Sequence, residues 1–274
     1  MVKYSVSSWI YGDEPMEQSI ERLSKCGYDG IEIYGEPQKV SAKEIWRLSK
    51  RYGLEASSIC GIYTKDRDLV SSSEKTRNNA INYVKDCTKM AHELGVSVVI
   101  VVPSAVNKVK PEVAPDQEWK WAVEGVREAG RYAMNLGVSL AIEALNRYET
   151  YLVNRIGQAM ELVEDVALDN VGLMVDCFHM SIEDESLANA IIAAKKKLLH
   201  VHIADSNRQT PGRGHTDFQS VVSALKQIGY SRYLTMEFLP PSADPYAALK
   251  GARTREFYDL YTKESIEYMK RIWQ

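Results

Sequence analysis

The chain has 274 residues, of which 45% are hydrophobic and 26% charged, and its formal net charge is −3 at pH 7. These values are ordinary for a soluble globular protein, and a chain of this length buries a large core without cross-links. The slightly acidic balance argues against a nucleic-acid partner, because proteins that bind nucleic acids carry a positive excess or stripe. No Ser-, Gly- or Pro-rich linker interrupts the sequence, so we expect residues 1–274 to form a single domain.

The cysteines and the apolar runs indicate the cellular compartment of the protein. The four cysteines, Cys26, Cys60, Cys87 and Cys177, form no CxxC pair and no close cluster, which favours a reduced, cytosolic protein. The N-terminal sequence MVKYSVSSWIYGDEP lacks the apolar stretch of a signal peptide. The longest apolar run, Val98 to Val102, is too short to span a bilayer. We therefore expect a cytoplasmic protein with no membrane partner.

Glycines mark a repeating pattern along the chain. Each of five glycines follows a helical pattern and precedes a strand-like run: Gly27, Gly53, Gly95, Gly137 and Gly229. A glycine just past a helix end supplies the left-handed residue that terminates the helix. The repeated order of helix, glycine and apolar strand is typical of βα units.

Eight strands are predicted in chain order. They lie near Tyr4–Trp9, Gly30–Tyr34, Glu55–Cys60, Val96–Val102, Leu140–Leu145, Gly172–Cys177, Leu199–Ala204 and Leu234–Phe238. Several are continuous apolar runs, as expected for parallel strands that are covered by helices. The helical spacing is clearest over residues 81–94, with Ser71 and Glu74 as a candidate capping box, and a last helix is predicted over roughly 255–273.

Parallel strands with helical connections leave two architectures, a closed barrel and an open doubly wound sheet. No GxGxxG motif follows the first strand, which removes the main sequence support for a dinucleotide-binding open sheet. Eight evenly spread units favour closure. The sequence therefore predicts an α/β protein with a single (β/α)8 TIM barrel.

Ionisable residues stand at the ends of the last four strands, where apolar ones would be cheaper to bury. They are Glu143, Asp176, His202 and Glu237. The carboxyl ends of barrel strands meet at the mouth that holds active sites, and an isolated buried carboxylate costs several kcal/mol. A single glutamate at a strand end is more often a surface ion-pair partner. Four such residues on consecutive strands instead favour a divalent cation, and three carboxylates with one imidazole suit Mn²⁺, Mg²⁺ or Co²⁺ better than structural zinc.

The neighbouring residues leave alternatives open. Glu149 follows the fifth strand, and Arg208 follows the seventh, where it would either hold a substrate oxygen or form an ordinary loop salt bridge. His200 is expected to be either a hydrogen-bonded core histidine deeper in the barrel or a residue that supports the metal ligands from behind. Five aromatic residues are candidates for the wall of a sugar pocket: Trp9, Tyr11, Tyr63, Trp119 and Trp121. For the three tryptophans, packing against helices is an equal alternative.

Four motifs in this order carry a resemblance. AIEALNRYETYLVN, VDCFHM, HVHIADSNRQTPGRGH and TMEF together resemble the xylose isomerase-like barrel superfamily, and the chain is most similar to ketose 3-epimerases of the D-tagatose and D-psicose (allulose) type. The resemblance implies a metal site of Glu143, Asp176, His202 and Glu237, acid/base roles for Glu143 and Glu237, and sugar-holding roles for Glu149, His179 and Arg208. It also implies Mn²⁺ as the first choice of metal, a homo-oligomer (dimer or tetramer) and a role in carbohydrate metabolism.

One departure leaves the substrate open. The epimerases of this family usually carry Glu where this chain has Asp205. The version found here resembles the broader sugar isomerase/epimerase group, which includes inositol-pathway enzymes and lyases that cleave C-glycosides of 3-keto sugars.

The expected chemistry is proton transfer at a carbon next to a carbonyl. One carboxylate takes the proton from one face and the other returns it on the opposite face, while a cation stabilises the enediolate. The sequence thus predicts an isomerase, a metal-dependent C3 epimerase of a free ketose. An aldose–ketose isomerase or a lyase acting on 3-keto glycosides would use the same residues. An endonuclease IV-like DNA repair enzyme fits poorly, because such sites need many histidines and this chain has five.

Overall fold

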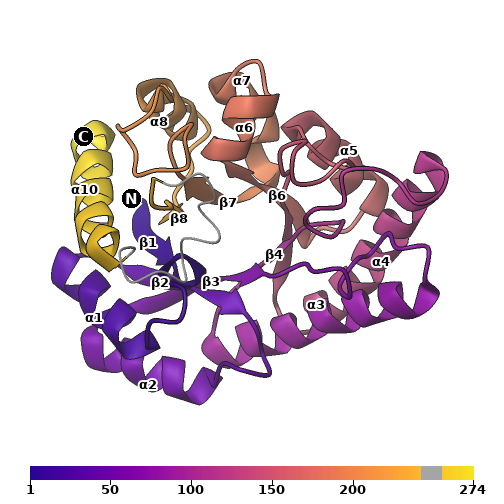
Figure 1. Cartoon of the computed structure of the whole chain (residues 1–274), viewed down its shortest axis with the longest axis horizontal. Helices are drawn as coiled ribbons and strands as arrows, with labels where there is room; N and C mark the ends of the chain where they lie inside the picture. The colour runs from indigo at the N-terminus through magenta and orange to yellow at the C-terminus, as the bar shows by residue number, and fades with distance from the viewer. Residues whose placement is uncertain (242–254) are drawn as a thin grey trace.

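Parallel strands close into a barrel. The computed structural model describes residues 1–241 and 255–274, and within them eight strands pair in chain order, with β8 returning to β1 (Figure 1). The strands are β1 (Lys3–Ser7), β2 (Gly30–Gly35), β3 (Glu55–Gly61), β4 (Val98–Val101), β5 (Ser139–Ile142), β6 (Val171–Asp176), β7 (Leu198–Ile203) and β8 (Tyr233–Met236). The predicted (β/α)8 barrel is confirmed.

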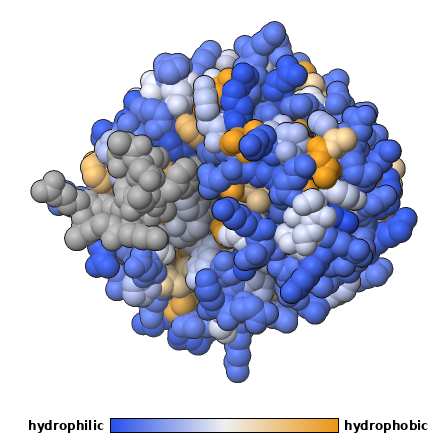
Figure 2. Space-filling view, turned by 45° about the vertical axis from the view of Figure 1, so that its right-hand side comes forward, coloured by the Kyte–Doolittle hydropathy of each residue, from blue (hydrophilic) through white to orange (hydrophobic). Residues whose placement is uncertain are grey.

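Helices cover the outside of the barrel. They are η1 (Ser8–Tyr11), α1 (Met16–Cys26), α2 (Ala42–Tyr52), α3 (Glu74–Leu94), α4 (Pro115–Asn135), α5 (Ile156–Val166), α6 (Cys177–Glu183), α7 (Leu187–Ala194), η2 (Lys195–Lys197), α8 (Phe218–Gln227) and α10 (Arg255–Trp273). The last of them lies between α1 and α8 and completes the outer ring (Figure 1). Their apolar faces point inward, so the face shown in Figure 2 is mostly hydrophilic. In the described ranges, no helix combines the length and the apolar character that a bilayer crossing requires.

The helix ends show which local predictions hold. All five predicted glycines have φ between 70° and 77°. At Gly53 and Gly95 an added Cβ would meet nothing within 4 Å, so the left-handed backbone alone explains these glycines. The predicted cap at Ser71 is wrong. Ser73 is the N-cap of α3, because its hydroxyl accepts the Thr76 N–H, while the Ser71 hydroxyl accepts the N–H of Ser73.

The two faces of the strands bury different groups. Val99 and Val101 of β4 belong to the large core between barrel and helices, whereas Val98 and Ile100 belong to a small cluster on the opposite, interior face. On the β1, β2, β3, β7 and β8 side the interior holds buried polar residues as well. They include Ser5, Glu32, Ser58, His200, His202 and Thr235. The barrel interior is therefore partly ionisable, directly below the mouth.

Candidate active site

Four side chains converge at the mouth of the barrel. Glu143, Asp176, His202 and Glu237 each offer a ligand atom, and these atoms lie within 4.8 Å of one another. His202 Nδ1 lies 3.0 Å from Glu237 Oε2, and it lies 4.0 Å from both Glu143 Oε1 and Asp176 Oδ2. All four residues are buried. The structure thus brings together the residues that the sequence proposed as metal ligands.

The ends of the strands set these positions. Asp176 is the last residue of β6 and the N-cap of α6, where its Oδ1 accepts the Phe178 N–H at 2.8 Å and Oδ2 faces the other three residues. Glu143 and Glu237 each lie one residue beyond a strand, after β5 and β8. The indole N–H of Trp9, which lies in η1 and not in the predicted first strand, donates to Glu237 Oε1 at 2.6 Å. These contacts fix the orientation of the Asp176 and Glu237 carboxylates.

Burial and neighbouring charges shift the pKa values of three of these residues in different directions. Burial raises the pKa of Glu143 well above its usual range, and the neighbouring Glu237 and Asp176 carboxylates raise it further. Burial also opposes ionisation of Asp176, but Arg208 and His179 hold its pKa below the ordinary value. Burial likewise disfavours the imidazolium of His202, yet Glu237 and Glu32 raise its pKa well above the ordinary value.

The donor set fits a divalent cation. His202 Nδ1 is buried and has no hydrogen-bond partner in the described part of the chain, although three carboxylates surround it. A cation at this point would accept the nitrogen lone pair and offset the repulsion between carboxylates. Three oxygen donors and one nitrogen donor suit a hard or borderline ion such as Mg²⁺, Mn²⁺ or Co²⁺.

The predicted sugar-holding residues line a cavity beside this centre. Glu149, His179 and Arg208 border a space of about 420 Å³, together with Glu143 and Glu237. Asn146 links two of them, since its Nδ2 donates to Glu149 Oε1 at 3.0 Å and lies 2.8 Å from His179 Nδ1. Burial lowers the pKa of His179, and the nearby Arg208 guanidinium lowers it further.

Arg208 is not the surface loop residue that one reading of the sequence allowed. It is only 5% exposed, and its guanidinium donates to Asp176 Oδ2 at 2.8 Å and to Glu237 Oε2 at 2.6 Å. Its φ of 62° is unusual for a residue other than glycine. The loop is organised by Asp205, whose carboxylate accepts the backbone N–H groups of Ser206, Gly212 and Thr216. Asp205, the departure from the epimerase pattern, therefore shapes the loop and does not line the cavity.

The barrel interior holds a glutamate that the sequence reasoning missed. Glu32, at the centre of β2, is fully buried, and its Oε2 lies 2.9 Å from His200 Nε2. The prediction that His200 is a hydrogen-bonded buried histidine is confirmed. Burial alone would raise the pKa of Glu32, but the imidazoles of His202 and His200 hold it well below the ordinary value. The signal was present, because Glu32 interrupts the apolar run GIEIY.

The aromatic candidates divide into two groups. Trp9 and Tyr63 line the cavity. Tyr11 instead packs in the core with its hydroxyl 2.6 Å from Thr262 Oγ1. Trp119 donates to Asp165 on the outside of the barrel, and Trp121 stacks with Arg77. Two of the five candidates therefore line the cavity, and helix packing holds for Trp119 and Trp121.

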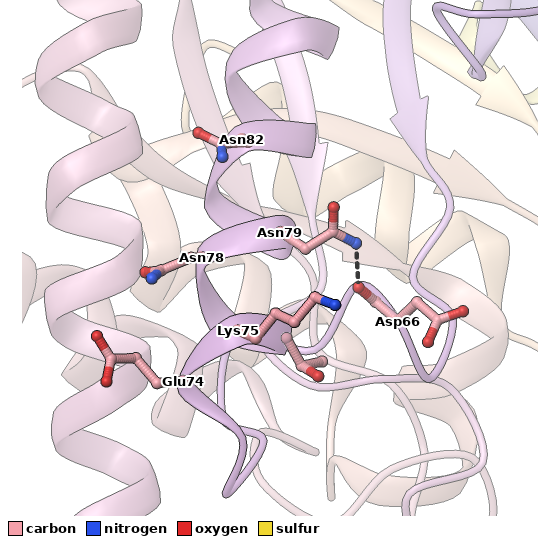
Figure 3. A pocket seen from close by; sticks show the side chains of 7 residues that line it. Asp66, Glu74, Lys75, Asn78, Asn79 and Asn82 are labelled. Carbon is pink, nitrogen blue, oxygen red and sulfur yellow. Dashed lines mark hydrogen bonds between the residues drawn. The ribbon is translucent and has the colours of Figure 1, made fainter.

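A larger hollow lies elsewhere, at the start of α3. It has a volume of about 960 Å³ and is lined by Asp66, Glu74, Lys75, Thr76, Asn78, Asn79 and Asn82 (Figure 3). Its residues are mostly exposed, and Glu74 and Asn78 point away from Asp66 in this view. A surface hollow without convergent buried groups lacks the features of a reactive site, whatever its size.

Comparisons with known proteins agree with this geometry. Residues 20–271 match the model of the xylose isomerase-like TIM barrel family. A D-psicose 3-epimerase of Ruminiclostridium cellulolyticum is 31% identical over 224 residues, covering 80% of this chain and 76% of that protein. The 3-dehydro-D-guloside 4-epimerase of Escherichia coli is 27% identical over 92% of this chain and 97% of its own length.

A solved structure extends the likeness to three dimensions. The D-psicose 3-epimerase with D-tagatose from Clostridium cellulolyticum H10 superimposes with a TM-score of 0.88 at 25% identity, and the match covers 99% of both chains. The prediction of a carbohydrate epimerase agrees with these relatives, which are sugar epimerases by name. On sequence and structure together, this chain belongs to the xylose isomerase-like TIM barrel family.

Proposed function

We propose that this protein is a metal-dependent sugar epimerase that inverts C3 of a free ketose through an enediolate. The observation that carries the proposal is the pair Glu143 and Glu237. Both are buried, both border the same cavity, and both lie within 4.8 Å of an imidazole nitrogen and a third carboxylate. They follow β5 and β8, so they reach the cavity from different sides of the barrel.

Glu143, Asp176, His202 and Glu237 would hold the cation, with Mn²⁺ as the first choice and Mg²⁺ or Co²⁺ as alternatives. When bound, such an ion neutralises the negative charge that develops on the sugar's oxygens as the carbon acid loses its proton. The buried, oxygen-rich set of donors supports this choice over a thiolate-rich zinc site.

The residues of the chain perform the proton transfers. One of Glu143 and Glu237 removes the proton from C3, and the other delivers a proton to the opposite face. Trp9 and Arg208 each donate to one oxygen of Glu237 and so fix its orientation. Glu149, His179 and Arg208, all at the cavity wall, would hold the oxygens at the carbonyl end of the sugar.

The test is a screen of free ketoses with the purified protein, first stripped with a chelator and then reloaded with Mn²⁺. We expect interconversion of C3 epimers, such as D-fructose and D-psicose, that disappears on chelation and returns with Mn²⁺. Turnover that is unchanged by chelation, or aldose products alone, would contradict the proposal. The latter result would favour an aldose–ketose or inositol-pathway isomerase.

A second candidate substrate is a 3-keto glycoside, turned over by an epimerase or by a lyase. A second cavity of about 590 Å³ adjoins the first and shares Lys65, Val106 and Asn107 with it. This space would take a glycosidic substituent that a free ketose lacks. One relative, the 3-dehydro-D-guloside 4-epimerase, is named for such a substrate. Faster turnover of 3-keto glucosides than of free ketoses would favour this alternative.

We also propose the finer properties that the sequence predicted. Residues 1–274 would form one domain and assemble into a homo-oligomer, a dimer or a tetramer, in the cytoplasm, with no nucleic-acid or membrane partner. The free cysteines of the described residues fit a reducing compartment. Light scattering coupled to size exclusion measures the oligomer directly, and a monomer at micromolar concentration would contradict that part.

A further inference from the structure

A buried carboxylate lies directly beneath the proposed metal ligands. Glu32 is fully buried at the centre of β2, and it reaches across the barrel interior to β7. His202 Nε2 lies 3.0 Å from Glu32 Oε1 and 3.2 Å from Oε2. The mechanism above gives Glu32 no role, yet burying an ionisable group at this depth costs free energy unless its partners compensate.

The hydrogen bonds to Glu32 go to its Oε2 atom, while Oε1 has no hydrogen-bond partner within the described residues. Oε2 accepts the Ser58 hydroxyl at 2.6 Å and lies 2.9 Å from His200 Nε2. Together with His202, three groups from β3 and β7 therefore converge on the two oxygens of one carboxylate. The contacts of Ser58 and His202 with Oε2 are direct hydrogen bonds. This arrangement fixes the carboxylate rigidly, because each neighbour comes from a strand and not from a loop.

The geometry also decides which nitrogen of His202 faces the mouth. A neutral imidazole has one N–H and one lone pair, and the partner of one nitrogen sets the role of the other. With Nε2 against Glu32, Nδ1 is the atom that lies among Glu143, Asp176 and Glu237. Nδ1 is also the atom without a hydrogen-bond partner in the ranges described.

We propose that Glu32 is a positioning residue for the metal centre: by accepting the Nε2–H of His202, it holds that imidazole in the orientation and tautomer that present the Nδ1 lone pair to a divalent cation. The inference rests on the metal site of the proposed function. Carboxylates that accept from a ligating histidine raise its basicity and are worth ten- to a hundred-fold in metal affinity in other proteins.

The experiment measures Mn²⁺ binding by titration calorimetry on the full chain, for the wild type, Glu32→Gln and Glu118→Gln. Gln at position 32 keeps the shape but removes the charge. Glu118, in α4, is a matched control because it is also fully buried, and its partners are Lys108, Tyr151 and the backbone before α4. Thermal melting of the metal-free forms accompanies each titration, so that a loss of fold is separated from a loss of affinity.

We expect one Mn²⁺ per chain in the wild type, a ten- to a hundred-fold larger Kd in Glu32→Gln, and a Kd within about two-fold of the wild type in Glu118→Gln. If Glu32→Gln does not fold, Glu32→Asp takes its place. The shorter side chain keeps the negative charge but moves it away from His202, so the affinity for Mn²⁺ should again fall about ten-fold or more.

Three results would overturn the inference. The first is an unchanged Kd in the folded variant at position 32, which leaves the proposed metal site standing. The second is an equal loss of Mn²⁺ affinity in Glu118→Gln, which would mean that loss of any buried carboxylate weakens binding. The third is a second Mn²⁺ lost with Glu32, which would make Glu32, His200 and His202 a separate cation site. A wild type that binds no Mn²⁺ would instead remove the metal site itself, and with it the inference.

Discussion

Replacing Arg208 with alanine in the metal-free protein is expected to lower the free energy of unfolding by about 3 to 5 kcal/mol, the usual cost of removing one partner from a buried ion pair. The guanidinium lies 2.8 Å from Asp176 Oδ2 and 2.6 Å from Glu237 Oε2, and the side chains of all three residues are at most 5% exposed. Without Arg208, these two carboxylates would face each other and Glu143, with the imidazoles of His179 and His202 beside them. The penalty therefore comes from uncompensated buried charge and not from lost packing alone.

The assay is calorimetric melting after chelation and again with saturating Mn²⁺. For a protein of this size, each kcal/mol shifts Tm by about 2–4 °C, so the metal-free variant should melt about 10 °C below the wild type. A cation at a thousand times its Kd stabilises the folded state by about 4 kcal/mol, and it also replaces the missing positive charge. The difference between variant and wild type should therefore shrink in Mn²⁺.

Arg208→Lys is the matched control, because it keeps a charge but lacks the two-pronged geometry, and an intermediate Tm is expected. A metal-free Arg208→Ala protein that melts within about 1 °C of the wild type would refute the reasoning, because the carboxylates would then not depend on this guanidinium. A difference that grows in Mn²⁺ would equally contradict it.

Further expectations follow from the same site and from one acid outside it. Glu143→Gln and Glu237→Gln should each abolish nearly all epimerisation at saturating, measured Mn²⁺. In D₂O the wild-type product should carry deuterium at the inverted carbon, and unlabelled product would exclude the two-carboxylate path. Glu149→Gln should raise KM or lower kcat with the Mn²⁺ stoichiometry unchanged. Loss of the metal in this variant would contradict the substrate-holding role of Glu149. Burial raises the pKa of Asp184 to about 6, so its ionisation disfavours the fold at neutral pH. Asp184→Asn should therefore stabilise the protein at pH 8, by about 1 kcal/mol after allowance for partial exposure, and the gain should vanish below about pH 4. Denaturant unfolding of Asp184→Asn and the wild type at both pH values measures this gain. An equal gain in stability at both pH values would contradict the raised pKa of Asp184.

The barrel fold and the four proposed metal ligands could be predicted from the sequence for the same reason. Parallel strands are apolar runs with sharp ends, so a charged residue at such an end stands out, as Glu143 and Glu237 do. Because strand ends share one mouth in a barrel, four separate signals predicted one cluster. The positions of these residues required only the order of strands, and no knowledge of loop conformation.

The contacts of Arg208 and Glu32 could be found only from the structure. Arg208 sits in a loop whose left-handed backbone turns the side chain inward, and loop conformation follows from tertiary hydrogen bonds such as those of Asp205. Glu32 lies inside an apolar run, where its identity as a charged residue was visible. Its partners are His200 and His202, about 170 positions later in the chain, and no local pattern connects them.

Strands carry the proposed metal ligands and loops form the outer walls of the cavities, and this separation has an evolutionary consequence. The proposed ligands stand on buried strands or at their ends, where a substitution disturbs the barrel itself. The outer wall of the adjoining cavities is built by exposed loop residues such as Lys65, Asn107 and Lys110, where substitutions cost little stability. Divergence can thus exchange one sugar for another by altering these walls, while the proposed metal ligands stay unchanged.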